Sequence, residues 1–180
     1  VDAEILAKLN ERARTVLEVG QLKGAAGLPV YEPAREQGIV ERLSAQNTGP
    51  FPNRGIVPVF REIVSATRSL EAVLRVAYLG PPGTFSHQAA LRHFGHLPET
   101  LPCASIRDVF AAVARGEAGV GIVPVENTTE GIVTQTYDCL ADSELTLCGE
   151  AQLRIANHLL SKSGERARVR RVASHPQPLA

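Results

Sequence analysis

The stretch VAYLGPPGTFSHQAA, residues 76–90, decides the fold class of the second half of the chain. Its apolar run predicts a short buried strand, and after the Gly-Pro-Pro-Gly turn a helix follows to about Phe94, with Gly95 at its end. A glycine-rich turn between strand and helix presents backbone N–H groups at a positive helix terminus, which favours an anion. The spacing fits neither a dinucleotide fingerprint nor a P-loop, so a small-anion site and a structural turn with a helix cap both stay open.

Strands and helices alternate from Arg75 onward, which is typical of an α/β domain with a largely parallel sheet. The expected later elements are a helix in IRDVFAAVARG (106–116) capped by Ser105 and Asp108, a strand in GVGIVPVEN (119–127), a helix in EGIVTQTYDCLA (130–141), a long strand or strand pair in LTLCGEAQLRIANHLL (145–160) and a final strand in VRRVAS (169–174).

The stretch PVENTTEG (124–131) places polar side chains where an apolar strand ends. Glu126, Asn127, Thr128 and Thr129 are therefore expected at the carboxyl edge of the sheet, where ligands of open α/β sheets bind. A loop that merely caps the next helix is the alternative interpretation.

The first 71 residues show helical apolar spacing and no strand signal. Three helices are expected: one from Val1 past Gly20, one from Pro33 to about Ala45, and one carrying Ile56 to Leu74 with Pro58 in its first turn. Helical spacing aligns three sets of polar side chains: Arg12 with Lys23, Glu32 with Arg35 and Glu36, and Thr67 with Glu71. From spacing alone, a shared site and a solvated face with i,i+4 pairs both stay open.

The chain has 180 residues, of which 44% are hydrophobic, and nineteen basic residues balance nineteen acidic ones. This balance offers no electrostatic footprint for nucleic acid or an anionic membrane. No apolar run reaches the roughly 18 residues of a membrane span, and no signal peptide is recognisable. The cysteines and histidines lack metal-ligand spacing, so we expect reduced thiols in a cytoplasmic protein without a metal site.

The segments LNERARTVLEVGQLKG (9–24), LPVYEPAREQGIVERL (28–43) and VFREIVSATRSLE (59–71) resemble the all-helical AroQ-type chorismate mutase domain. The resemblance implies a three-helix domain, which we bound at residues 1–74. It also implies a set of chorismate-binding residues: Arg12, Lys23, Glu32, Arg35, Glu36, Thr67 and Glu71.

In that family, the cations bind the two carboxylates of chorismate and the residue at Glu36 holds the substrate hydroxyl. Lys23 and Glu71 flank the ether oxygen, and with Arg12 they form the implied catalytic set. The rearrangement of chorismate to prephenate needs no nucleophile or cofactor. Catalysis therefore requires a held conformer and donors at the breaking C–O bond.

Two departures from the mutase pattern carry expectations. Glu71 stands where many family members have Gln, and a carboxyl donates to the ether oxygen only when protonated, so we expect activity to fall as pH rises. The family also completes each site with an Arg from the partner's first helix in an interlocked dimer. That Arg would lie upstream of Val1, so we expect an incomplete mutase site in this chain.

The motifs YLGPPGTFSHQAA (78–90), GIVPVENTTEGIVTQTYDCL (121–140) and SHPQPLA (174–180) resemble prephenate dehydratase in order and spacing, over residues 75–180. The resemblance implies two α/β lobes, arranged as in a periplasmic binding protein, with the site in the cleft. It implies that prephenate is bound by Gly83, Thr84, Phe85, Ser86, Glu126, Asn127, Thr128 and Ser174. Glu126 is a candidate for orienting the substrate or transferring a proton.

A mutase domain ahead of a dehydratase domain resembles the bifunctional P-protein family of phenylalanine biosynthesis. The resemblance implies an isomerase and lyase that converts chorismate to prephenate and then phenylpyruvate, as a cytoplasmic homodimer without a cofactor, nucleic acid or membrane partner. The family's catalytic Thr-Arg-Phe motif and its ACT domain, which binds L-phenylalanine as feedback inhibitor, would lie beyond Ala180. We therefore expect a piece of a longer protein, incomplete for both reactions.

The alternative is a non-catalytic small-anion-binding α/β module with a helical dimerisation domain. That alternative leaves the charged residues of the helical half unexplained.

Overall fold

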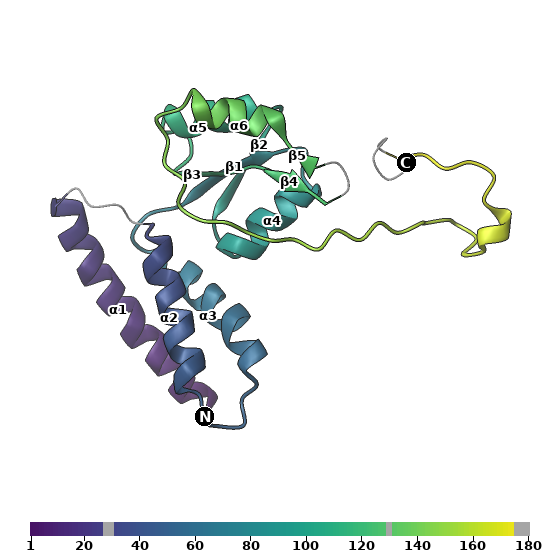
Figure 1. Cartoon of the computed structure of the whole chain (residues 1–180). Coiled ribbons are helices and arrows are strands. Elements are labelled where there is room, and N and C mark those ends of the chain that lie inside the picture. The colour runs from purple at the N-terminus through teal and green to yellow at the C-terminus, as the bar shows by residue number, and fades with distance from the viewer. Residues whose placement is uncertain (27–30, 129–130, 175–180) are drawn as a thin grey trace.

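The computed structural model describes residues 1–26, 31–128 and 131–174, which form a helical part followed by an α/β part (Figure 1). The helical part consists of α1 (Asp2–Ala26), α2 (Pro33–Gln46) and α3 (Asn53–Arg68). The third helix packs against both of the others. Pro33 occupies the first turn of α2, where its fixed φ suits a helix start. The expected order of an all-helical part and then an α/β part is confirmed.

The third helix differs from the expectation at both ends. It begins at Asn53, so Pro58 lies in its second turn, and it ends at Arg68 rather than near Leu74. Leu74 packs against the core of the α/β part, so its side chain is not part of the apolar face of α3. Helix-like turns continue to Glu71, whose N–H donates to Arg68 O at 2.9 Å.

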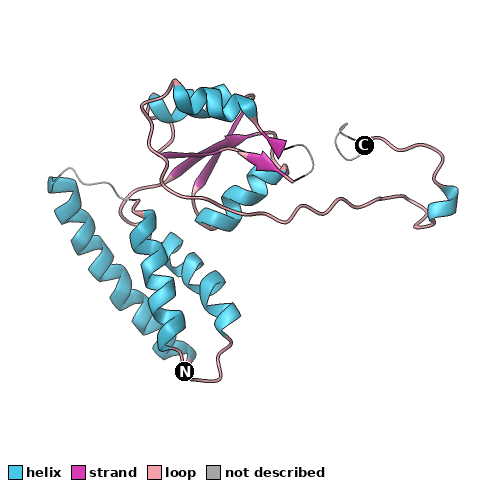
Figure 2. Cartoon of the chain, viewed as in Figure 1, coloured by secondary structure: helices cyan, strands magenta, loops and turns pink. Residues whose placement is uncertain are grey.

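The α/β part is built on a parallel three-stranded sheet of order β2-β1-β3 (Figure 2). Its elements are β1 (Arg75–Leu79), α4 (Phe85–Phe94), β2 (Glu99–Cys103), α5 (Ile106–Ala114) and β3 (Val120–Ile122). Val76 packs with residues of α4, and Ala77 packs with residues of α5. Successive strand side chains face opposite sides, so these helices cover both faces, as is usual for parallel sheets.

The predicted helix caps of this part are confirmed. Ser105 Oγ accepts from the N–H of Asp108 at 3.2 Å and caps α5. Thr84 Oγ1 accepts from the N–H of His87 at 3.3 Å and caps α4. Gly95 ends α4 at φ +86°, a left-handed conformation that favours glycine.

Strand β2 was not expected, because Pro102 interrupts its strand pattern. Proline is tolerated there since β2 lies at the edge of the described sheet. The single strand predicted over 119–127 was wrong: it divides into β3 and β4 (Glu126–Asn127), and β4 pairs antiparallel with β5 (Gly131–Ile132). As a result, α6 (Thr134–Ala141) begins later than predicted.

The strands predicted over 145–160 and 169–174 were also wrong. Among the described residues after α6, the only regular element is the 3-10 helix η1 (Arg166–Arg168), and the rest runs as an extended segment (Figure 1). A strand needs a neighbour for its backbone hydrogen bonds. No described strand pairs with this segment, so its apolar pattern does not become a sheet.

Candidate functional site

A cavity of about 50 Å³ lies in the helical part. All seven residues expected to bind chorismate line it: Arg12, Lys23, Glu32, Arg35, Glu36, Thr67 and Glu71. Four further residues complete the lining: Val16, Ile39, Val64 and Arg68. The cavity is therefore lined by side chains from α1, from α2 and the residue just before it, and from the end of α3 and the turn that follows.

Two side-chain pairs cross this cavity. Arg12 Nη1 donates to Thr67 Oγ1 and joins α1 to α3. Lys23 Nζ donates to Glu32 Oε1, and Lys23 is only 8% exposed. The hydrogen bond from Lys23 lowers the pKa of the Glu32 carboxyl. Both basic side chains are therefore held at the cavity by oxygen atoms that a ligand oxygen could replace.

The charge of the lining favours an anion. It contains four basic side chains (Arg12, Lys23, Arg35 and Arg68) and three acidic ones (Glu32, Glu36 and Glu71), an excess of one positive charge. Burial and then the neighbouring Arg35 lower the pKa of the Arg12 guanidinium, while Glu36 and Glu71 oppose this shift. A bound carboxylate would offset the repulsion between the two guanidinium groups.

Glu71 is the lining residue with a buried side-chain oxygen that is left unpaired in the part of the chain that the structure describes. Its Oε2 is buried and has no hydrogen-bond partner among the described residues. Buried polar atoms are nearly always paired, so this oxygen is a candidate for a ligand contact. Gly20 of α1 makes the space: a Cβ at that position would lie 2.8 Å from Glu71 Cγ.

Arg68 is the functional candidate that the sequence motifs missed. It is 5% exposed, and its Nη1 lies 2.5 Å from Glu36 Oε1. The available signal was a lone basic residue on the apolar side of α3, directly after Thr67. A basic residue in the last helical turn is commonly explained by the helix dipole alone, so that signal was weak.

The glycine-rich turn holds the start of α4. Thr84 Oγ1 accepts from His87 N–H and donates to Leu79 O at 3.1 Å, so its proton is used and one acceptor lone pair is left. Gly83, at φ +88°, donates its N–H to His87 Nδ1 at 3.1 Å. The His87 ring stacks on Tyr78 with centroids 4.8 Å apart, which fixes the ring that accepts from Gly83.

The other residues expected around prephenate lie on three segments: the start of α4, the stretch after β3 and the extended segment after α6. Phe85 is 42% exposed, and Ser86 is half-buried in the first turn of α4. Strand β3 lies beside β1 in parallel, so the stretch from Pro124 to Thr128 leaves the sheet at the same carboxyl edge as the glycine-rich turn. Thr129 lies outside the described residues.

Glu126 and Thr128 are exposed there, and Asn127 is half-buried. Ser174 is exposed in the extended segment that follows α6. The rest of its motif, residues 175–180, lies outside the described residues.

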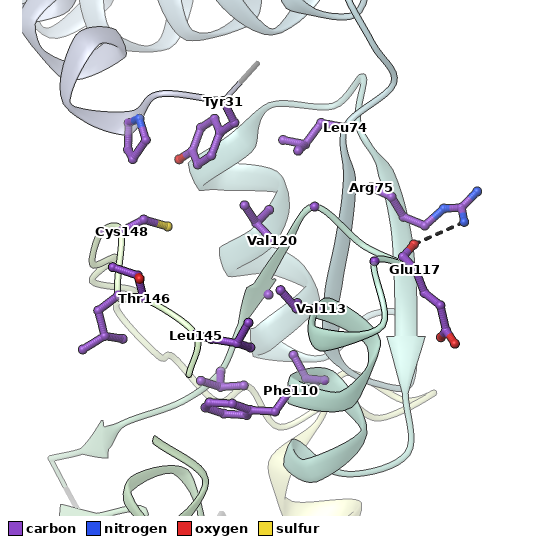
Figure 3. Close-up of a pocket in the computed structure, with 18 of the residues that line it drawn as sticks. Tyr31, Leu74, Arg75, Phe110, Val113, Glu117, Val120, Leu145, Thr146 and Cys148 are labelled. Carbon is purple, nitrogen blue, oxygen red and sulfur yellow. Dashed lines mark hydrogen bonds between the residues drawn. The ribbon is translucent and has the colours of Figure 1, made fainter. Parts of the chain in front are cut away.

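A much larger groove, of about 770 Å³, runs along β3 and α5 (Figure 3). Its lining is mainly apolar, with Phe110, Val113 and Leu145 on its walls and Tyr31 at the side of the helical part. None of the residues expected at either site lines it. Its size does not make it the candidate site, because it lacks the converging charged groups of the helical cavity.

A family model described as prephenate dehydratase matches residues 76–180, more than half of the chain. This chain belongs to the prephenate dehydratase family. A model described as chorismate mutase type II matches residues 1–72. Both resemblances expected from the motifs are confirmed.

The curated relatives carry both names. The bifunctional chorismate mutase/prephenate dehydratase of Aquifex aeolicus (strain VF5) is 45% identical over 184 residues, covering 100% of this chain and 51% of that protein. The protein of the same name from Escherichia coli (strain K12) is 34% identical over 198 residues, covering 99% and 51%. The chain thus spans about half the length of the curated relatives it matches.

An X-ray structure of prephenate dehydratase from Streptococcus mutans aligns at 40% identity and a TM-score of 0.37, covering 38% of this chain and 36% of that one. Within residues 1–26, 31–128 and 131–174, no helix is long and apolar enough to cross a membrane. The same residues contain no cluster of three side chains suited to a metal ion.

Proposed function

We propose that this chain carries a chorismate mutase site in residues 1–74 and part of a prephenate dehydratase site in residues 75–180. The two activities are consecutive steps toward phenylalanine, chorismate to prephenate and prephenate to phenylpyruvate. The observation that carries the proposal is the convergence of the seven motif residues around one cavity with an excess of positive charge. The names of the curated relatives support both assignments.

For the mutase step, the carboxylates of chorismate would replace Thr67 and Glu32 as partners of Arg12 and Lys23. Arg35 adds charge to the same site, and Glu36 would accept the substrate hydroxyl. Lys23 would donate to the ether oxygen as its bond breaks, and Glu71 would do so when its carboxyl is protonated. Catalysis then rests on a fixed reactive conformer and on donors placed where charge develops, without a cofactor.

For the dehydratase step, the glycine-rich turn and residues 126–128 would form one wall of the prephenate site, since both follow carboxyl ends of adjacent strands. Thr84 and Ser86 are the turn hydroxyls proposed to contact substrate, Thr84 as an acceptor because its proton is engaged with Leu79 O. Glu126 would orient the substrate or protonate the departing hydroxyl. We propose Ser174 as a further hydrogen-bonding group.

The proposal includes a cytoplasmic homodimer whose partner completes the mutase site, and L-phenylalanine as an effector bound outside this chain. The alternative, a small-anion-binding α/β module with a helical dimerisation domain, explains the second half. It gives no reason for a charged cavity with an unpartnered carboxylate oxygen inside the helical part.

The test is conversion of chorismate by the full-length protein from its complete reading frame. Arg12→Met is expected to reduce kcat/KM for chorismate by about 100-fold or more, because a charged group that holds the reactive conformer is lost. Arg14→Met is the matched control, because Arg14 is exposed on the same helix. Ser86→Ala is assayed with prephenate as substrate. No prephenate from chorismate, or equal rates for Arg12→Met and Arg14→Met, would refute the mutase assignment.

A further inference from the structure

The Arg68 guanidinium lies between the helical part and the α/β part. Its Nη1 binds Glu36 Oε1 at 2.5 Å, and its Nη2 donates to Phe94 O at 3.3 Å. Its Cζ also sits 5.2 Å from the centroid of the Tyr31 ring. One buried side chain therefore contacts α2, the segment before it, and the end of α4.

Each of these contacts suits a cation. Phe94 is the last residue of α4, and carbonyl groups at a helix C-terminus carry partial negative charge without an intrahelical partner. The Tyr31 ring offers its face to the guanidinium and packs on the Phe94 ring, with centroids 5.5 Å apart. Burial of Arg68 leaves little water to compete for these bonds.

The surrounding contacts hold α3 against the end of α4. Gly95 fits directly against Ser65, since a Cβ on Gly95 would lie 2.8 Å from Ser65 Cβ. Glu62 accepts from the N–H of His96 at 3.3 Å and lies 3.0 Å from His96 Nδ1. The two parts therefore meet in a packed interface around Arg68, at the end of α4 opposite the glycine-rich turn.

We propose that Arg68 is a positioning residue. It holds the Glu36 carboxylate in place in the helical cavity while its own guanidinium is bonded to the α/β part. The functional consequence rests on the mutase function proposed above, in which Glu36 accepts the substrate hydroxyl. Arg68 occupies Oε1 of Glu36 and leaves the second oxygen for that contact. The geometry of the helical site thus depends on the folded α/β part.

The first test is a double-mutant cycle in the full-length protein. Arg68→Met is expected to lower kcat/KM for chorismate about 10–100-fold by releasing Glu36. In a Glu36→Gln background the same change is expected to cost less than about threefold, because the charged carboxylate that Arg68 positions is replaced by a neutral amide. Arg54→Met, an exposed residue of α3, is the control and is expected to match the wild type. Equal losses in both backgrounds, or no loss, would overturn the proposal.

The second test does not need activity. In calorimetry, Arg68→Met is expected to lower Tm by about 5 °C, and by clearly less when Glu36 is already Gln. Arg68→Lys keeps the charge but cannot reach Glu36 and Phe94 O together, so it is expected to fall between Met and the wild type in both assays. An inactive wild-type protein would refute the mutase function, whereas additive Tm losses for Arg68 and Glu36 would refute the positioning role itself.

Discussion

Replacing Gly20 by Ala tests whether α1 makes the space that Glu71 uses in the helical cavity. A Cβ on Gly20 would lie 2.8 Å from Glu71 Cγ and 3.4 Å from Glu71 Cβ and Cδ. The first separation is well inside van der Waals contact, so the Glu71 side chain must rotate. Because Cγ is near the root of that side chain, its rotation carries the carboxylate away from its present position.

The stability change is the balance of two terms. Gly→Ala within a helix stabilises by about 0.5–1 kcal/mol, and overpacking costs about 1–3 kcal/mol. Gly20→Ala is therefore expected to lose roughly 0–2.5 kcal/mol, which lowers Tm by up to about 10 °C. Gly24→Ala is the matched control on the same helix, because among the described residues an added Cβ there has no atom within 4 Å beyond its chain neighbours and its own helix backbone. It is expected to raise Tm by about 1–4 °C.

The two variants are expected to separate further in activity. For Gly20→Ala, kcat/KM for chorismate falls about 10–100-fold because Glu71 leaves the ether oxygen. For Gly24→Ala it stays within about twofold of the wild type. Thermal denaturation and the loss of chorismate absorbance measure both quantities in the full-length protein. If Gly20→Ala behaved like Gly24→Ala in both assays, the packing argument for Glu71 would be refuted.

Three further changes address protonation and capping. Glu71→Gln is expected to flatten the decline of mutase activity with rising pH, because an amide donates to the ether oxygen at every pH. Burial, and then Arg61 and Arg68, lower the pKa of His93 below 6.5, so the unfolded chain binds a proton first as pH falls. As pH falls, the resulting decrease in Tm begins near pH 6.5 and is complete below the pKa of His93 in the folded protein. His93→Gln is expected to make this decrease smaller. Thr84→Ala removes the cap of α4 and is expected to cost about 1 kcal/mol in chemical denaturation.

Each of these has a contradicting outcome. An unchanged pH–activity profile in Glu71→Gln would show that protonation of this carboxyl does not govern the rate. A wild-type dependence of Tm on pH in His93→Gln would remove His93 as its cause. Ser86→Ala is the capping control, since Ser86 also lies at the start of α4, and an equal loss there would show that the Thr84 hydroxyl does not stabilise the helix.

Short-range patterns were sufficient to predict the helices and several of their ends. Pro33 begins α2, Ser105 caps α5 together with Asp108, and Gly95 closes α4. These signals act between residues within about four positions of one another, so they can be read along the chain. Helical spacing likewise predicted that Arg12 and Lys23 share a side of α1, and both line the helical cavity.

Strands were predicted less well, because a strand also needs a neighbour. The stretch 145–160 has an apolar pattern but no pairing partner among the described residues, and it stays irregular. In contrast, β2 contains Pro102 and still pairs with β1 over its whole length. The availability of an adjacent strand outweighed the local pattern in both cases.

By itself, the sequence determined the helices, the order of an all-helical and an α/β part, and the identity of the charged residues. Only the tertiary structure decided which of their faces meet. Arg12 bonds Thr67, 55 positions away, and Arg68 bonds both Glu36, 32 positions away, and Phe94, 26 positions away. The physical reason is that spacing within a helix follows from local geometry, whereas burial and pairing depend on which surfaces the folded chain brings together.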